Sequence, residues 1–503
     1  MTRGGDPPTP ADPLSIPAPV AAGNRAVAGA ELEGTLEALP SQSRRTRRRF
    51  SKGWEHVTDD PNPVRFVVLP PTGTRPAAEF GDLLEQLGGL TSAVAARQFA
   101  ASCGMRRGRV ECDIRVLDSV RDDGPKLMQM SPEAANQLRA HQPGLRIVPE
   151  VFFSPAHVRH AARRAAPRAA SAAKTAFSVV ARVGGEPIRG ATVVAFTDFA
   201  AGIGGEGRTK ADGSALLSLG AMKRIERIYV YAPPGWWGGF RRNVMVMRGE
   251  PIVVRLSKLD LADPDALRHY YPSTAPDVGS GVTVGVVDTG VGPHDDLFVA
   301  GGLNTVLGED AADFADSGAG HGTHVAGIIA ARGTPPTGVR GVAPGVRLMS
   351  YRVFGKDQSG ASNFAILKAI DRAVQDGCDI VNLSLGGIVR DPAIASAIQD
   401  ARAAGTVVIG AAGNDQRAPV SFPAAEPACL AISALGVKGT FPRGAMEEAD
   451  VREPFGTDPR EFIAGFSNVG MEIDLAGPGV GVVSTVPGGL APMSGTSMAS
   501  PAV

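Results

Sequence analysis

The feature that most constrains the fold is an apolar run from Val282 to Val287, in which Thr283 is the only polar residue. Such a run, rich in β-branched side chains, is typical of a strand that is buried on both faces of a parallel sheet. The run ends at Asp288, which a Thr-Gly pair follows. Because open α/β folds bind ligands at the carboxyl ends of their strands, we expect Asp288 to lie in a functional site of an α/β domain.

Two further segments supply side chains that complement a buried carboxylate. His321 precedes a glycine and an apolar stretch that ends at Ala331, which predicts a helix with the imidazole at its start. Ser497 follows Gly495 and precedes helix-forming residues, so we expect it at a helix N-terminus, where free N–H groups favour negative charge. Taken singly, these residues would be a strand-end aspartate, a satisfied histidine and an N-cap serine. Together they form a nucleophilic site, because a serine hydroxyl needs a base with a pKa near neutrality.

In the order Asp288, His321 and Ser497, the three segments resemble the subtilase (subtilisin-like) serine peptidases, whose chain order differs from that of other serine hydrolases. The resemblance covers residues 265 to 503 and implies a serine endopeptidase that works through an acyl-enzyme intermediate. His321 would take the Ser497 proton, and Asp288 would orient the imidazole and stabilise its charged form. The resemblance also implies that the Asn414 amide donates to the oxyanion, together with the Ser497 backbone N–H.

Substrate-binding positions are implied by the same resemblance. Residues 380–387 are similar to the wall of the primary specificity pocket, residues 411–413 to its facing wall, and residues 358–361 to the edge that pairs with substrate as an added strand. The residues expected to touch substrate are Ser359, Gly360, Ser384, Leu385, Gly386, Ala411, Ala412 and Gly413. Residues 421–423 would lie near the pocket floor. Because these walls are small and uncharged, we expect a broad preference for apolar or neutral side chains.

No metal or other cofactor is expected. His324 stands three residues after His321, as in a zinc pair on one helix face, but no third ligand at metal spacing and no HExxH sequence accompany it. Many subtilases hold calcium in a loop after the histidine helix, and Asp296 matches a calcium ligand of the family. The corresponding loop, residues 332–338, has no carboxylate or amide side chain, and Asp296 lacks its partners.

Residues 1–60 are expected to be disordered, because they are rich in Pro, Ala and Gly and show no periodicity. They contain no basic start followed by an apolar segment, so no secretory signal is predicted, although the resemblance implies an extracellular protein. The arginine cluster at 44–49 is compatible with a nucleic-acid or membrane patch, a processing site or a solvated tail. With zero formal net charge and no apolar run of about 18 residues, we expect no nucleic-acid partner and no membrane span. A monomer is also expected.

Residues 61–153 follow a β-α-β-β-α-β pattern. Strands are predicted at 64–69, 112–120, 126–130 and 145–152, and helices at 81–101 and 132–142. Ser131 and Pro132 give the second helix an N-cap and a suitable first residue. This order is ferredoxin-like. Ahead of a subtilase core it resembles the inhibitory propeptide of these enzymes, whose tail occupies the substrate cleft until it is cut.

Two segments separate this unit from the catalytic domain. Residues 154–174, rich in Ala and Arg, are expected to form an exposed linker and a cleavage zone. Residues 175–257 alternate apolar and polar positions in short runs punctuated by glycine, which predicts a small antiparallel β-sandwich. This segment resembles the carboxypeptidase-regulatory or transthyretin-like modules. Its aromatic residues Trp236, Trp237 and Phe240 would form a binding patch or pack in a core.

The catalytic domain is expected at 262–503, with crossover helices at 363–376 and 391–404 and an acidic surface insertion at 437–464. The cysteines are Cys103, Cys112, Cys378 and Cys429; a bridge between the first two and free thiols both remain open. A chain that ends at Val503 would lack part of the helix behind Ser497. Two hypotheses therefore stand: a zymogen endopeptidase that acts on polypeptides and is inhibited by its own propeptide, or a catalytically silent binding protein.

Overall fold

The computed structural model describes residues 64–75, 78–89, 114–158, 160, 162, 174–220, 223–247, 249–356, 358–453 and 458–503. The disorder expected for residues 1–60, the arginine cluster, and Cys103 and Cys112 lie outside this part of the chain. All contacts below fall within one compact unit, Pro61–Val503. Among the described residues, no helix is long and apolar enough to cross a membrane.

The C-terminal half is an α/β domain built on an eight-stranded sheet. The strand order is β14-β15-β13-β17-β19-β20-β21, and β22 also pairs with β20. The strands are β13 (Thr283–Asp288), β14 (Val299–Asn304), β15 (Arg347–Arg352), β17 (Ile380–Leu383), β19 (Val407–Ala411), β20 (Cys429–Val437), β21 (Glu461–Ile463) and β22 (Ile473–Pro478). Every pairing is parallel except that of β20 with β21. The expected α/β domain with a mostly parallel sheet is confirmed.

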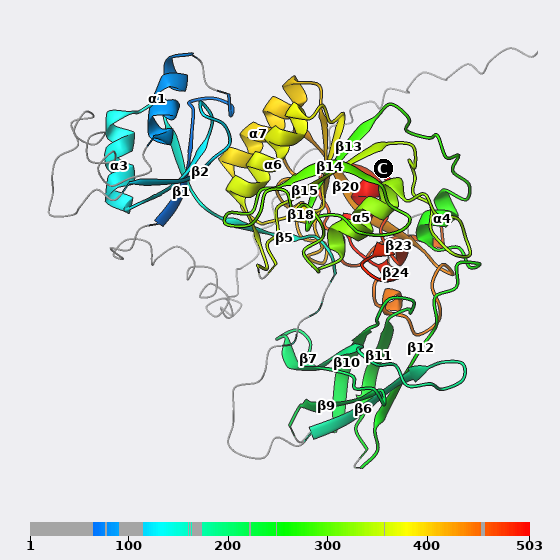
Figure 1. Ribbon diagram of the computed structural model, residues 1–503. Helices are drawn as coiled ribbons and strands as arrows, with labels where there is room; N and C mark the ends of the chain where they lie inside the picture. The colour runs from blue at the N-terminus through cyan, green and yellow to red at the C-terminus, as the bar shows by residue number, and fades with distance from the viewer. Residues whose placement is uncertain are drawn as a thin grey trace, which may run out of the picture. The chain divides into compact units, whose positions relative to one another are not determined.

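Helices cover both faces of this sheet. The predicted crossover helices are α6 (Asn363–Gln375) and α7 (Pro392–Ala403), which pack against each other beside the sheet (Figure 1). Val287 of β13 belongs to the core that they cover, whereas Val284 and Val286 pack with α5 (His321–Ala330). Neighbouring residues of β13 thus face opposite sides, as the period of a strand requires.

Short elements complete this domain. They are α4 (Ala266–Tyr270), the 3₁₀ helix η1 (Met446–Ala449), the hairpin β23 (Val482–Val486) and β24 (Gly489–Met493), α8 (Thr496–Ala499) and the 3₁₀ helix η2 (Ser500–Ala502). The hairpin packs on α5, and α8 packs on β20 and β22. The serine segment is therefore held between the histidine helix and the sheet.

The first unit is a four-stranded antiparallel sheet of order β2-β3-β1-β4 with two helices among its described residues. Its elements are β1 (Val64–Leu69), α1 (Ala78–Gly88), β2 (Arg115–Ser119), β3 (Lys126–Met130), α3 (Pro132–His141) and β4 (Arg146–Pro149). Val67, Leu69 and Leu127 belong to the same buried cluster as the facing side chains of α6 and α7. Lys368 on α6 forms an ion pair with Asp118 at 2.7 Å. One face of this small sheet is therefore covered by the catalytic-domain helices.

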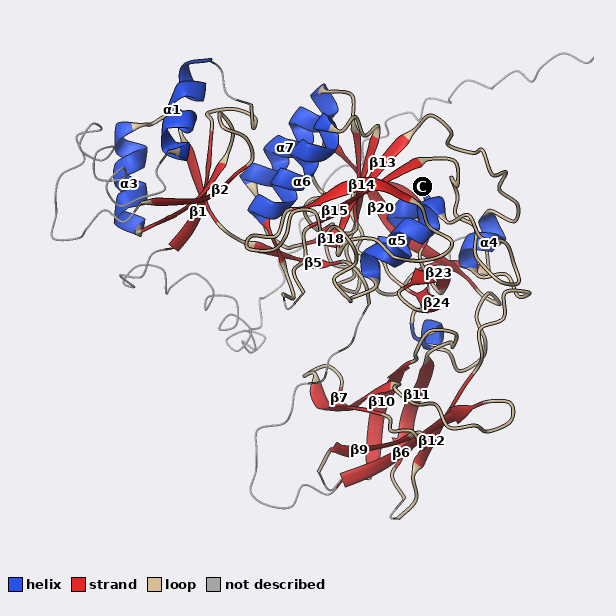
Figure 2. Cartoon of the chain, viewed as in Figure 1, coloured by secondary structure: helices blue, strands red, loops and turns tan. Residues whose placement is uncertain are grey.

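The third unit has strands but no helix among its described residues (Figure 2). Its strands are β6 (Lys174–Ala181), β7 (Thr192–Asp198), β8 (Ile203–Arg208), β9 (Ser214–Ser218), β10 (Arg224–Tyr231), β11 (Gly239–Met245) and β12 (Ile252–Leu256). Two sheets, β11-β10-β7-β8 and β12-β6-β9, enclose one apolar core. The expectation of purely antiparallel pairing is wrong, because β12 pairs with β6 in parallel. Hereafter this unit is called the sandwich.

Contacts fix the sandwich against the α/β domain. The Phe240 N–H donates to the Gly444 carbonyl at 2.9 Å, and the Gly235 N–H donates to Leu490 at 2.8 Å. Trp237 is buried in a cluster that includes Val483. Trp237 and Phe240 are thus packing residues, one of the two roles that the sequence left open.

Candidate active site

Asp288 and His321 meet at the carboxyl edge of the parallel sheet. Asp288 is the last residue of β13 and His321 is the first residue of α5. The His321 Nδ1 lies 2.7 Å from the Asp288 Oδ1, and both side chains are buried. Gly322 permits this approach, because a Cβ there would lie 2.3 Å from the Gly290 carbonyl oxygen. The carboxylate holds the imidazole ring through Nδ1. The other ring nitrogen, Nε2, has no hydrogen-bond partner among the described residues.

Ser497 lies in the first turn of α8 and is buried. Its hydroxyl donates to the Ser384 carbonyl at 3.1 Å, and no described hydrogen bond joins it to His321. Its backbone N–H donates to the Ala156 carbonyl at 3.2 Å. The structure therefore brings the serine to the same cleft as the Asp-His pair, with the hydroxyl turned toward Ser384.

The Asn414 side chain is oriented by the residue that precedes the serine. Its Oδ1 accepts hydrogen bonds from the Thr496 N–H at 2.9 Å and from the Thr496 hydroxyl at 3.1 Å. Because the carbonyl end of the amide is fixed in this way, the Nδ2 donor points elsewhere. The Nδ2 is buried and has no hydrogen-bond partner among the described residues. A preorganised donor without a partner is suited to stabilising a developing negative charge.

The cleft holds a segment of the protein itself. Strand β5 (Phe152–Pro155) lies between β16 (Ala361–Ser362) and β18 (Leu385–Gly386) and pairs antiparallel with both. The Ala156 N–H then donates to the Ser384 carbonyl at 3.0 Å, and the Val158 N–H donates to the Ser494 carbonyl at 3.1 Å. The expectation that residues 154–174 begin as an exposed linker is therefore wrong. Cleft edges on both sides satisfy the backbone groups of this segment.

His157 follows the residue whose carbonyl meets Ser497. The centroid of its ring lies 5.0 Å from that of His321. The peptide bond between Ala156 and His157 thus lies beside the serine, the histidine and the Asn414 amide.

The predicted substrate-binding residues divide into two groups. The first group lies along the bound segment. Ser384, Leu385 and Gly386 pair with it through the backbone as described above, Gly360 lies against Phe152, and Ser359 lines the same pocket as Phe152 and Ser154. The second group is Ala411, Ala412 and Gly413, which no described hydrogen bond joins to residues 152–158. Instead the Gly413 N–H donates to the Thr496 hydroxyl at 3.0 Å. Phe422 belongs to the segment expected near the pocket floor, and the centroid of its ring lies 6.1 Å from that of the Phe153 ring.

Asn363, which was not predicted from the sequence, binds the backbone where the chain enters the cleft. Its Nδ2 donates to the Pro149 carbonyl at 3.0 Å, and its backbone N–H donates to the Val151 carbonyl at 2.8 Å. The same Nδ2 donates to the buried Asp391 carboxylate at 2.8 Å. In the sequence, Asn363 appears only as the start of a crossover helix, so no local signal distinguishes it.

His324 packs inside the domain, and its ring faces two backbone carbonyls. Its Nε2 lies 3.1 Å from the Val482 carbonyl oxygen and 3.0 Å from that of Ala491. Burial lowers the pKa of His324 to about 3, so the ring is neutral and its N–H donates to these carbonyls. Among the described residues, no cluster of His, Cys, Asp and Glu could hold a metal ion.

The surroundings of Asp296 do not fit a calcium ion. One carboxylate oxygen accepts the Val339 N–H at 2.9 Å, and the carboxylate packs against Gly333 and Gly338. Calcium requires a shell of six to eight oxygen ligands. The Asp296 carboxylate instead accepts a backbone N–H and packs against the backbone of two glycines.

Part of the acidic insertion is buried, contrary to the expectation of a surface segment. Glu447 in η1 is 2% exposed, and its Oε2 has no hydrogen-bond partner among the described residues. Burial raises the pKa of Glu447 to about 7, with a smaller contribution from the charge of Glu448. Burial also raises the pKa of Asp450 well above its usual range. Packing against the sandwich explains this burial, because Phe240 and Tyr229 share an apolar cluster with Ala449.

We expect the Glu447→Gln substitution to stabilise the protein at alkaline pH. The raised pKa means that the folded state holds a proton between pH 4.5 and about 7 that the unfolded chain has lost, so stability falls as pH rises through this window. Above pH 8, the variant should gain up to about 3 kcal/mol in the free energy of unfolding. Urea unfolding in a Ser497→Ala background measures it. The gain should vanish below pH 4.5, and Glu250→Gln, at an exposed glutamate before β12, should show no such trend.

The C-terminal half of the chain is similar to known proteins of one family. A family model described as the subtilase family matches residues 279–503. Subtilisin DY of Bacillus licheniformis is 38% identical over 231 residues, which are 45% of this chain and 74% of the relative. Subtilisin BL of Lederbergia lenta is 37% identical over 226 residues, 45% of this chain and 74% of the relative. Alkaline elastase YaB of Bacillus sp. (strain YaB) is 39% identical over 226 residues, 45% of this chain and 53% of the relative.

Proposed function

The chain belongs to the subtilase family and is a subtilisin-like serine endopeptidase, and we propose that it acts through Asp288, His321 and Ser497 and first cleaves itself. The observation that carries this proposal is the 3.2 Å hydrogen bond from the Ser497 N–H to the Ala156 carbonyl. That bond presents the carbonyl carbon of the Ala156–His157 peptide to the serine.

The proposed reaction uses groups that are already in place. The Ser497 hydroxyl turns from the Ser384 carbonyl toward His321, whose Nε2 takes its proton as the oxygen attacks the Ala156 carbonyl carbon. The oxyanion is held by the Ser497 N–H and the Asn414 Nδ2. When the C–N bond breaks, the imidazolium gives its proton to the leaving nitrogen of His157. Water then hydrolyses the acyl-enzyme by the same two steps.

We infer that the described N-terminal unit is an inhibitory propeptide and that the protein is made as a zymogen. Its sheet packs on α6 and α7, and Asn363 and the cleft edges hold its tail in an extended conformation. Pairing of an extended chain with exposed strand edges is a general mode of peptide recognition. Polypeptides with small residues before the cleaved bond are the proposed substrates, because Ala156 occupies this position here.

The family resemblance alone supports two further proposals: that the enzyme acts outside the cell and that it functions as a monomer. The residues around Asp296 support catalysis without calcium at that position. Two observations favour a second candidate function, a silent binding protein. The Ser497 hydroxyl donates to Ser384, and the cleft is filled by β5.

A fluorophosphonate reagent separates the two candidates. We expect the folded chain to gain one adduct, located at Ser497 by peptide mass spectrometry, because only an activated serine reacts. The Ser497→Ala variant should gain none. Ser500→Ala removes a neighbouring buried hydroxyl and should keep the adduct. A folded wild-type chain that gains no adduct would favour the silent protein.

A further inference from the structure

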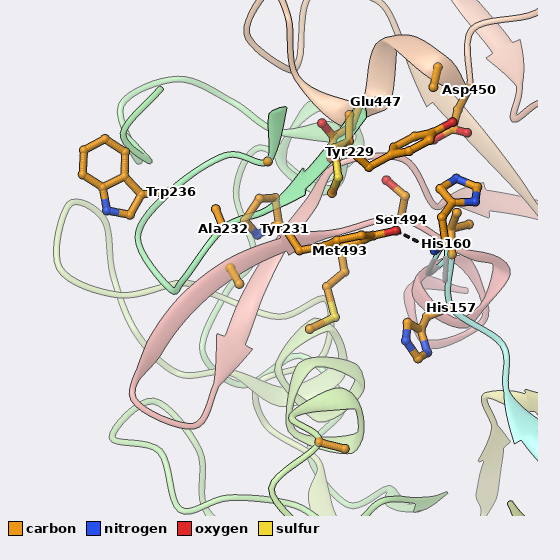
Figure 3. Close-up of a pocket in the computed structure, with 17 residues that line it drawn as sticks. His157, His160, Tyr229, Tyr231, Ala232, Trp236, Glu447, Asp450, Met493 and Ser494 are labelled. Carbon is orange, nitrogen blue, oxygen red and sulfur yellow. Dashed lines mark hydrogen bonds between the residues drawn. The ribbon is translucent and has the colours of Figure 1, made fainter. Parts of the chain in front are cut away.

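The segment that follows the proposed cleavage point runs onto the sandwich. After Val158, which is bonded to Ser494, the His160 backbone N–H donates to the Tyr231 hydroxyl at 2.6 Å (Figure 3). Ala162 packs against an apolar cluster formed by the sandwich and η1. The sandwich therefore continues the cleft on the side of the leaving group, hereafter called the primed side.

The His160 ring occupies a cage of aromatic side chains on the sandwich. Its centroid lies 4.1 Å from that of Tyr229, 5.4 Å from that of Phe199 and 6.3 Å from that of Phe196. Two of these contacts are edge-to-face, a favourable arrangement for aromatic rings. We call Phe196, Phe199 and Tyr229 the ring cage.

Charge near the ring cage selects against a cation. The Arg227 guanidinium lies over Phe199, 3.6 Å from the ring centroid. Burial, with a smaller contribution from Arg227, lowers the pKa of His160 to about 4. At neutral pH the cage therefore holds an uncharged ring.

A cavity lies beside the ring cage on the primed side of the cleft. It measures about 240 Å³ and lies between the sandwich and the α/β domain, where His157, Tyr231, Glu447 and Met493 contribute to its walls (Figure 3). Backbone contacts hold these walls together, because the Phe240 N–H donates to Gly444 and the Gly235 N–H to Leu490. The ring cage thus has a fixed position relative to Ser497.

We propose that the sandwich is the primed-side half of the substrate-binding site, and that its ring cage binds a flat, uncharged side chain at the fourth residue after the cleaved bond. His160 is this residue when the Ala156–His157 bond is counted as the cleaved one. The proposal rests on the proposed function, from which the cleaved bond is taken. It assigns to the sandwich a part in substrate selection, with Tyr231 binding the substrate backbone and the ring cage binding the side chain.

Docking of the segment can be measured without catalysis. In a full-length Ser497→Ala chain, hydrogen exchange read at single residues should show a protected His160 amide. Tyr231→Phe removes the acceptor, so this amide should exchange about tenfold faster while the Val158 amide, bonded to Ser494, is unchanged. A His160 amide that exchanges freely in Ser497→Ala would overturn the proposal, whether or not the wild type is an active enzyme.

Substrate selection is measured on the self-processed enzyme with substrates that share the residues before the bond. A p-nitroanilide has no primed residues, whereas quenched peptides carry Phe or Ala as the fourth primed residue. Tyr229→Ala should lower kcat/KM about tenfold more for the Phe peptide than for the anilide or the Ala peptide. Leu216→Ala, at an exposed site of the sandwich, should change none of them.

His160→Ala gives a change of opposite sign. After self-cleavage the tethered His160 competes with substrate for the ring cage, so its removal should raise kcat/KM for the Phe peptide several-fold. A purely structural role of His160 would instead lower the rate on every substrate, and that result would overturn the proposal. If the wild type hydrolyses no anilide, the proposed function fails, and the exchange measurement alone decides whether the sandwich binds the segment.

Discussion

Ser497→Ala and His321→Ala should each leave the full-length chain uncut. Without the serine there is no nucleophile, and without the histidine no group accepts the hydroxyl proton, since the free Nε2 of His321 is the described base beside the serine. The expected loss of kcat is on the order of 10⁶-fold, the magnitude known for the same residues in subtilisin. Intact mass of the purified chain against time measures the cleavage.

The matched control for the histidine is His269→Ala, which removes an exposed imidazole on α4. This variant should be cut at the wild-type rate. Cleavage of purified Ser497→Ala or His321→Ala at the wild-type rate would show that another peptidase cuts the chain, and self-cleavage would then be rejected.

Asn414→Ala should have the second-largest effect, a fall in kcat of about 10²–10³-fold with little change in KM, as for the matching donor in subtilisin. The reason is that Nδ2 has no described partner in the resting cleft and gains one only when the oxyanion forms. Steady-state kinetics on a peptide anilide measures both constants.

Asn414→Asp separates the role of the donor from that of the fold. The aspartate keeps an oxygen that accepts from the Thr496 N–H, so the serine turn should remain in place. It lacks the N–H donor and places a negative charge near the oxyanion, so kcat should fall at least as far as in Asn414→Ala. An Asn414→Asp enzyme with wild-type kcat would rule out the oxyanion role.

Local patterns were sufficient to predict much of the α/β domain. The apolar run before Asp288 predicted a doubly buried strand, and β13 ends at that residue. The predicted helix starts at His321 and near Asn363 follow from apolar periodicity, and α5 and α6 begin there. Each of these features depends only on residues that are close together in the sequence, so it can be predicted without knowledge of the tertiary structure.

Features that depend on distant partners could not be predicted. Residues 152–155 have no strand pattern of their own and form β5 because the cleft edges pair with them. Strand β8 has no apolar alternation of its own because it is rich in glycine; at Gly204 a Cβ would lie 2.0 Å from the Ala195 carbonyl oxygen. Glu447 appeared to be a surface residue because its burial depends on packing against the sandwich. The cage around His160 likewise joins residues far apart in sequence.

The identity of the cleaved bond is the measurement that bears most directly on self-cleavage. The purified full-length chain is incubated, and its products are identified by intact mass and N-terminal sequencing, beside Ser497→Ala. The hydrogen bond between Ser497 and Ala156 predicts one new N-terminus, at His157, in the wild type alone. A wild-type chain that stays intact, or that is cut elsewhere while Ala156–His157 remains whole, would contradict the proposed self-cleavage.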